Sequence, residues 1–268
     1  MTPSRVPRDP GRATIRIDPS VFVGQHPFRH LPHPDPEILV RVLDRERIER
    51  AWVGYLPAAY HRDPAPGNAE LLRLLGPHRD RLSPAPVVRP DFPRWEHALA
   101  EAADAGAAAI RAWPAQWRLA PDDARLAELA CACGARRLPL ILTVRLEDLR
   151  QRHPLDVAGD LQAAAVRALA RAGDDVRLIV CAAGREFIEE VHWGLTPREQ
   201  RRVAWDISWI WGPPEDHFAK LLRTLGPAQF VFGTQWPLRL VQAPAANLEL
   251  LPDDVAHPAL ADPGALFD

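Results

Sequence analysis

Short apolar runs alternate with longer amphipathic segments, and the alternation repeats eight times between residues 14 and 250. The apolar runs predict strands, and the segments between them carry apolar residues at helical spacing. The predicted strands are 14–18, 50–56, 82–88, 107–112, 138–144, 176–181, 202–208 and 229–233. The predicted helices are 36–47, 69–78, 93–104, 122–135, 156–171, 185–191, 215–225 and 244–250. Eight such units predict an α/β fold, a single (β/α)8 TIM barrel with parallel strands.

The length and charge of the chain limit what it encodes. One such barrel uses about 250 residues, so the 268 residues predict a single domain over 13–268. The Pro- and Arg-rich residues 1–12 are predicted to be a disordered lead-in. A net charge of −2 without a basic stripe argues against nucleic acid, and no apolar run is long enough for a membrane span. Three cysteines give no disulfide framework, which favours a cytoplasmic setting.

Alternation along each strand predicts which side chains enter the barrel. In 202–208, Val203 and Trp205 suit the helix layer, so Asp206 faces inward. The same reasoning places Ile17 against the helices and both Arg16 and Asp18 inside. TIM-barrel active sites lie at the carboxyl ends of the strands. The inward residues predicted at that end are Asp18, Arg89, Arg111, Thr143, Arg145, Asp206 and Gln235.

These charges allow three interpretations. Arg and Asp side chains could pair with each other and plug the mouth of a structural barrel. Alternatively, the guanidinium groups of Arg89, Arg111 and Arg145 bind an anionic ligand, because their forks match carboxylate and phosphate. In the third interpretation, Asp206 or Asp18 is a catalytic acid or base.

Tryptophans gather in the loops that follow the last predicted strands. Trp209, Trp211 and Trp236 lie near predicted strand ends, where aromatic side chains form either a ligand-stacking wall or a surface for a partner. The partner would be either a second copy of the chain or an active relative. Light scattering tests self-association, and co-purification tests a heterologous partner.

Other chemistry-bearing residues have plainer explanations. His26, His30 and His33 follow the first strand among prolines, and we interpret them as solvated or locally bonded side chains. Cys181 ends a strand with no histidine in obvious reach, so packing explains it better than nucleophilic chemistry. Lys220, the only lysine, lies in a predicted helix, which argues against Schiff-base chemistry.

Several segments together resemble the amidohydrolase-related (amidohydrolase 2) family of TIM-barrel hydrolases and decarboxylases, whose members usually hold a divalent metal. The similarity covers most of residues 13–251. It is carried by Asp18 with Gly24-x-x-Pro27-Phe28-Arg29, by Ala51-Trp52-Val53-Gly54, by Leu138-Pro139-Leu140, and by Val231-Phe232-Gly233-Thr234-x-Trp236-Pro237.

The family's metal ligands do not carry over to this sequence. Its first His-x-His pair falls on Ser20 and Phe22, and its later ligand positions fall near Thr143, on Ala182 and on Gln235. Phe and Ala supply no ligand atom, whereas a metal site needs several nitrogen or oxygen ligands converging on one ion. We therefore expect no metal site of the family type and no other cofactor.

The leading hypothesis is a nominal hydrolase without the usual metal. It would bind a small anionic, possibly aromatic, compound through Arg111, Arg145, Arg89, Thr143 and Gln235, with Trp209 and Trp236 beside them. One alternative is a catalytically silent barrel that serves as a scaffold or partner subunit of an active enzyme. Another is a metal-independent lactonase, with Asp206 as base and Arg111 or Arg145 stabilising an oxyanion.

The first prediction concerns metal content. Elemental analysis of protein purified without chelator should find divalent metal far below one ion per chain, because Phe22 and Ala182 cannot replace histidine ligands. Near-stoichiometric zinc or manganese that disappears on mutation of Asp18 or Asp206 would contradict this expectation.

Overall fold

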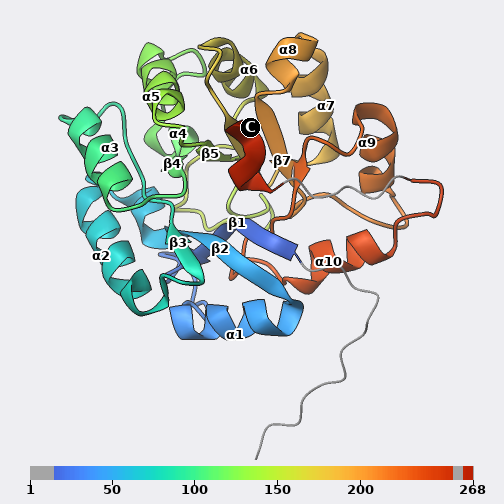
Figure 1. Cartoon of the computed structure of the whole chain (residues 1–268), viewed down its shortest axis with the longest axis horizontal. Helices are drawn as coiled ribbons and strands as arrows, with labels where there is room; N and C mark the ends of the chain where they lie inside the picture. Colours follow the sequence, from blue (N-terminus) through green and yellow to red (C-terminus); the bar gives the residue numbers. More distant parts are fainter. Residues whose placement is uncertain (1–14, 256–261, 268) are drawn as a thin grey trace, which may run out of the picture.

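A computed structural model describes residues 15–255 and 262–267, so the predicted lead-in at 1–12 lies outside the described residues. The strands are β1 (Ile15–Val23), β2 (Ile48–Tyr55), β3 (Leu82–Pro84), β4 (Ile110–Ala112), β5 (Leu140–Thr143), β6 (Leu178–Cys181), β7 (Val203–Asp206) and β8 (Phe230–Val231). Each falls on or overlaps one of the predicted strands. Helices surround these strands, as Figure 1 shows, and the fold is the predicted α/β TIM barrel.

The helices follow the strands in the order expected for βα units. They are α1 (Pro36–Glu46), α2 (Ala65–Leu75), α3 (Trp95–Asp104), α4 (Pro114–Trp117), α5 (Ala124–Ala135), α6 (Ala163–Arg171), α7 (Arg185–Trp193), α8 (Pro197–Gln200), α9 (His217–Leu225) and α10 (Gln242–Glu249). Short 3-10 helices lie at η1 (Leu56–Tyr60), η2 (Gly76–His78) and η3 (Pro263–Phe267). The short helices α4 and α8 were not predicted from the sequence, because each spans only about one turn.

All paired strands are parallel, in the order β1-β2-β3 and β4-β5-β6-β7-β8. Main-chain hydrogen bonds join the two groups beyond the end of β3: Arg111 N donates to Pro86 O at 2.8 Å, and Val88 N donates to Arg111 O at 3.1 Å. At the β8–β1 seam, Phe22 N donates to Trp236 O at 2.7 Å. Side chains complete that second seam, as described below.

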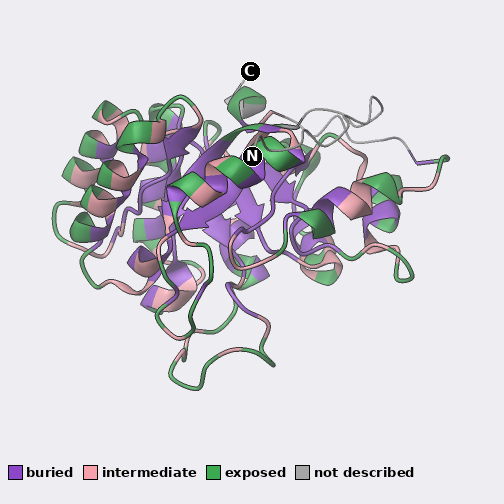
Figure 2. Ribbon diagram, turned by 90° about the horizontal axis from the view of Figure 1, so that it is seen from below, coloured by how far each residue is buried: buried purple, intermediate pink, exposed green. Residues whose placement is uncertain are grey.

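Two hydrophobic clusters lie on opposite faces of the strands. The interior cluster is narrow and rich in small side chains, and it comprises Trp52, Ala85, Ala109, Ile141, Ile179, Cys181, Ala204 and Val231. The larger cluster, which includes Val203 and Trp205, packs between the strands and the helices. Figure 2 shows buried strands at the centre, while exposed residues lie on the helices and loops outside them. The predicted parity of β7 is therefore confirmed, with Ala204 inside and Trp205 outside.

The prediction for the start of β1 is wrong in two respects. Ile17 packs against the interior cluster and not against the helices. The Arg16 side chain is 71% exposed and pairs with Asp262 at 3.4 Å. A shift in the β1–β2 register follows between Asp18 and Val21, so strict alternation does not hold along β1. The Arg16 pair ties η3 to the amino end of β1, and in Figure 1 η3 lies over the middle of the barrel.

The segment between β5 and α6 also differs from its prediction. A helix was expected over 156–171, but α6 begins at Ala163 and residues 144–162 form a long loop. Leu155 and Val157 are exposed in this loop. Hydrogen bonds to other loops at the mouth hold the segment, and these long-range contacts override its local helical periodicity.

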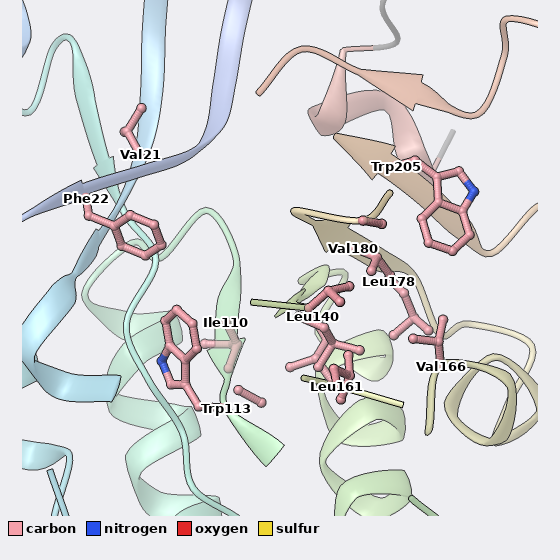
Figure 3. Packing of buried hydrophobic residues seen from close by; sticks show 14 of the residues in the cluster. Val21, Phe22, Ile110, Trp113, Leu140, Leu161, Val166, Leu178, Val180 and Trp205 are labelled. Carbon is pink, nitrogen blue, oxygen red and sulfur yellow. The ribbon is translucent and has the colours of Figure 1, made fainter. Parts of the chain in front are cut away.

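Large aromatic side chains fill the space between the strands and the helices, and Figure 3 shows two of these groups. Phe22 and Trp113 lie together, with 5.9 Å between their ring centres. Trp205 lies apart from them and makes an edge contact with Phe187 at 6.4 Å. Each of these three residues is about 99% buried, so each contributes strongly to stability.

Replacement of Trp205 tests this packing. Trp205→Ala should lower the free energy of unfolding by about 3–5 kcal/mol, because it removes a buried indole and leaves a cavity. Trp193→Ala is the matched control, since Trp193 is 65% exposed and its loss should change stability by no more than about 0.5 kcal/mol. Urea denaturation followed by circular dichroism measures both. Similar losses in the two variants would contradict the assignment of Trp205 to the core.

Candidate functional site

Seven polar residues meet inside the carboxyl end of the barrel, and we call them the buried polar centre. They are Asp18 and Ser20 of β1, Arg111 of β4, Asp206 of β7, Ser208 after β7, and Thr234 and Gln235 after β8. None of them is more than 6% exposed. Four of the seven are residues predicted from strand parity to face inward: Asp18, Arg111, Asp206 and Gln235.

Asp18 joins the first and last strands of the barrel. Its Oδ2 accepts from Thr234 Oγ1 at 2.7 Å, while its Oδ1 accepts from Ser20 N at 3.0 Å. Ser20 Oγ in turn accepts from Gln235 N at 3.1 Å, which adds a second link across the β8–β1 seam. Burial raises the pKa of Asp18 to about 6, although the Thr234 hydrogen bond opposes the shift. The carboxyl group is therefore partly protonated just below neutral pH.

Asp206 lies on the same inner surface and joins β7 to β6. Its Oδ1 accepts from Ala182 N and from Ser208 Oγ, both at 2.9 Å. Burial raises the pKa of Asp206, and the same two contacts oppose the shift. Asp206 Oδ2 forms no hydrogen bond with the described residues. A Cβ atom on Gly233 would lie 2.6 Å from this oxygen, so glycine is required for β8 to approach Asp206.

Arg111 supplies the positive charge of the centre. Its Nη2 donates to Pro19 O at 2.8 Å and lies 3.4 Å from the carbonyl oxygens of Val21 and Trp52. The guanidinium carbon lies 4.6 Å from the centre of the Phe22 ring. Burial lowers the pKa of Arg111 to about 10, whereas Asp18 and Asp206 act against this shift. The group is thus still a cation at neutral pH.

Several polar atoms of the buried polar centre have no hydrogen-bond partner among the described residues. Arg111 Nε and Nη1 are buried without a hydrogen-bond partner among the described residues. The same holds for both Gln235 side-chain atoms, Oε1 and Nε2. Gln235 also has a positive φ of 54°, a backbone strain of the kind that concentrates at binding and catalytic sites. Buried donors and acceptors without partners are costly, so a small polar molecule could satisfy them.

Trp209 and two arginines form the rim above Asp206. The guanidinium carbon of Arg239 lies 3.8 Å from the centre of the Trp209 ring, and that of Arg145 lies 5.4 Å from it. Burial lowers the pKa of Arg239, and the Asp206 carboxylate opposes this shift, so the two side chains lie within electrostatic reach. Trp209, Arg239 and Leu238 also line a small pocket of about 130 Å³. None of the seven residues of the buried polar centre lines this pocket, so Trp209 and Arg239 lie between the two.

The other predicted site residues lie around the mouth with partners of their own. Arg89 forms a two-pronged ion pair with Asp91, with both distances 2.8 Å, and stacks over Trp117. Arg145 pairs with Asp160 at 2.9 Å. Thr143 is buried at the end of β5, beside Cys181 in the register. The structure therefore places Arg111 in the centre, but Arg89 and Arg145 at its rim.

Two tryptophans expected to form an exposed surface are largely buried. Trp209 is 7% exposed under its two arginines, and Trp236 is 8% exposed with its ring stacked on His33. Trp211 and Trp193 are exposed, at 49% and 65%. The predicted apolar patch is thus reduced to Trp211 beside the mouth, because cation–π contacts and ring stacking cover its other members.

A second polar cluster fastens the long loop 144–162 across the mouth. His26 is buried, and its Nε2 lies 3.3 Å from the hydroxyl oxygen of Tyr60, which donates to Asp156 Oδ2 at 3.1 Å. Arg29 pairs with Glu147 at 2.8 Å. Burial lowers the pKa of His26 to about 4, and the charge of Arg29 adds to this effect, so the ring is neutral at pH 7. His30 and His33 are exposed, as their solvated interpretation predicts.

Sequence reasoning missed three contributors: Thr234, Arg239 and the structural role of Ser20. Ser208 shares the parity of Asp206, which predicts that it faces inward, although it was not among the predicted site residues. Thr234 has the opposite parity to Gln235, and the sharp turn at Gln235 brings it against Asp18. Arg239 follows the last strand by several residues, and no periodic pattern marks it.

Comparison with known proteins gives matches in structure only. No protein-family model matches the chain, and no curated protein matches it by sequence. The chain is similar to 2,6-dihydroxybenzoate decarboxylase in complex with 2,6-dihydroxybenzoate, with 13% identity, a TM-score of 0.66, and coverage of 95% of this chain and 96% of that one.

Two further solved structures are similar to this chain over most of its length. A dihydroxybenzoic acid decarboxylase from Polaromonas sp. JS666, with bound manganese and the inhibitor 2-nitroresorcinol, has 12% identity and a TM-score of 0.65 over 94% and 93% of the two chains. An amidohydrolase from Burkholderia multivorans with bound HEPES has 15% identity and a TM-score of 0.61 over 88% and 91%. These structural neighbours are TIM-barrel proteins of the amidohydrolase superfamily, and this chain has their fold.

Proposed function

We propose that the buried polar centre binds the carboxylate group of a small molecule, and that the chain acts on it as a hydrolase or lyase without a divalent metal. The observation that carries this proposal is the unused hydrogen-bonding capacity of Arg111 and Gln235, whose side chains are buried at 1% and 0% exposure. Two nitrogens of Arg111, Nε and Nη1, have no partner among the described residues, and the group keeps its positive charge. The Gln235 amide Nε2 also has no such partner and can donate.

Carboxylate is the ligand chemistry that these groups match best. The guanidinium charge strengthens a hydrogen bond from Arg111 Nε or Nη1 to a carboxylate oxygen. Both paired forks of the group include Nη2, which already donates to the main chain, so Nε and Nη1 would each bond a separate acceptor atom. Arg239 and Trp209 at the rim extend the same preference, because they add a cation and an aromatic ring near Asp206. The 2,6-dihydroxybenzoate bound to one structural neighbour is an aromatic carboxylate, and it lies in a barrel of the same fold.

A divalent metal, such as the manganese in one structural neighbour, does not fit the side chains of this centre. Asp18 and Asp206 are the carboxylates present, and no group of three or more His, Cys, Asp or Glu residues among those described could hold a metal ion. Two of their oxygens already accept hydrogen bonds from Thr234 and Ala182. The Arg111 cation lies in the field of both carboxylates and would repel a second cation. We propose that Arg111 provides the positive charge at this place.

The two carboxyl groups give the centre its acid–base capacity. Burial raises the pKa of both Asp18 and Asp206, so a proton can be held or released close to neutral pH. We propose that Asp206 exchanges a proton with the bound molecule through Oδ2, which has no hydrogen-bond partner among the described residues. Proton delivery of this kind serves both hydrolysis and decarboxylation.

Carboxylate binding can be tested by calorimetry with 2,6-dihydroxybenzoate and benzoate. We expect saturable binding and a rise in melting temperature, since a ligand of the native state stabilises it. Gln235→Glu should weaken binding at least about tenfold, because it sets a negative charge against the ligand. Gln162→Glu is the matched control at an exposed residue and should bind normally. Addition of a chelator should leave the affinity unchanged.

Two results would contradict the proposal. One is the absence of binding across a panel of small aromatic and aliphatic carboxylates. The other is binding that a chelator abolishes and that manganese restores, which would show a metal requirement. Arg111→Gln is a less direct test because Arg111 also bonds to the main chain of β1 and β2, so its folding must be verified first.

Binding should also depend on pH. The pKa of Asp18 is about 6, so rising pH adds a negative charge to the centre, which opposes a bound carboxylate. The dissociation constant should therefore increase roughly tenfold as the pH rises from about 5 to about 7.5. Asp18→Asn should flatten this dependence. An affinity that is constant across this range in the wild-type chain would count against a ligand close to Asp18.

A further inference from the structure

A second pocket opens at the mouth of the barrel, away from the buried polar centre. Its volume is about 250 Å³, and it lies between η1 and the residues after it, the residues around α4, and the loop 155–158. Neither Asp206 nor Gln235 lines it. We name it the rim pocket and define it by Phe28, Tyr60, Arg62, Gln116, Trp117 and Arg118.

Two arginines of the rim pocket have no counter-ion within residues 15–255 and 262–267. Arg62 and Arg118 are exposed, and no hydrogen bond or ion pair joins either side chain to the part of the chain that the structure describes. They come from different segments, one after η1 and the other after α4, so the fold brings the two charges to one pocket. Arg89 also lines the pocket, but Asp91 neutralises it through two hydrogen bonds of 2.8 Å.

Two residues that line the pocket also hold buried polar atoms without a partner. Trp117 Nε1 is a buried donor and Gln116 Oε1 is a buried acceptor, and neither has a partner among the described residues. The one lining carboxylate is engaged: Asp156 accepts from Tyr60 at 3.1 Å and from Ala158 N at 3.3 Å. The excess of donors over free acceptors favours an anion over a cation or a neutral molecule.

Aromatic side chains form the remaining walls. Phe28 meets Tyr60 edge-on, with 5.4 Å between ring centres, and His153 stacks on Phe28 at 5.2 Å. Trp117 lies under the Arg89 guanidinium at 5.5 Å. These contacts hold the rings in place before a ligand enters. A planar group attached to the anion would therefore meet rigid apolar faces.

We propose that the rim pocket binds a small phosphate monoester with a planar substituent. A phosphate dianion balances the charges of Arg62 and Arg118 and has enough oxygens to accept from both guanidinium groups. A monocarboxylate carries one charge and two oxygens, so it would leave one of the arginines unpaired. This site is independent of the carboxylate site proposed above, because the two share none of their binding residues.

Calorimetric titration of the full chain at about pH 7.5 tests the proposal with phenyl phosphate, inorganic phosphate and benzoate. We expect saturable binding of phenyl phosphate that weakens with added salt, as expected for exposed charges. Inorganic phosphate should bind more weakly, because it lacks the ring. The Arg62→Ala/Arg118→Ala double variant should lose at least about tenfold in affinity for phenyl phosphate.

The matched control is the Arg41→Ala/Arg201→Ala double variant. It removes the same total charge from exposed positions outside the pocket and should bind within about twofold of the wild-type chain. The proposal is overturned if phenyl phosphate does not bind, if both double variants lose affinity equally, or if neither does. It is also overturned if inorganic phosphate binds as tightly as phenyl phosphate, or if benzoate competes for the same site with equal affinity.

Discussion

Arg111 holds the two groups of strands together through its main chain and through its buried guanidinium group. Its main chain bonds to the segment after β3, and its side chain donates to carbonyl oxygens of β1 and β2. One residue thus joins the two groups of strands from both sides. A buried cation is costly without compensation, and the Asp18 and Asp206 carboxyl groups provide the opposite charge.

The carboxyl groups have structural duties of the same kind. Asp18 holds β8 against β1 through Thr234 and Ser20, while Asp206 holds β7 against β6 through Ala182 N. The narrow, alanine-rich interior below them leaves room for polar side chains at the carboxyl end of the barrel. The charges therefore serve the fold through hydrogen bonds to the main chain and to hydroxyl groups, and no ion pair joins Arg111 to Asp18 or Asp206 among the described residues. In the buried polar centre, the atoms that have no hydrogen-bond partner among the described residues belong to Arg111, Asp206 and Gln235.

The mouth of the barrel separates into regions with different chemistry. In the centre, the polar atoms are buried and few, which suits one small group of a ligand. At the rim, arginines stack on tryptophans, and acidic residues of nearby loops neutralise Arg89 and Arg145. The loop 144–162 contributes to both small pockets of the rim and is held by the cluster around His26 and Tyr60. Loop contacts thus decide which arginines remain available to a ligand.

Hydrophobic patterning predicted the fold class, the strand positions and the inward placement of Asp18, Arg111, Asp206 and Gln235. For Arg111 and Asp206, periodicity suffices because a strand in a closed barrel sends alternate side chains to the interior. Asp18 and Gln235 lie where alternation is broken, since Ile17 and Thr234 beside them also face the interior. Periodicity gave the wrong faces for Arg16 and Ile17, which lie just before the register shift in β1. Three features could be seen only in the folded chain: the partners of each charge, the burial of Trp209 and Trp236, and the place of Arg239 at the rim. These depend on contacts between loops far apart in sequence, and local patterns of hydrophobicity carry no record of such contacts.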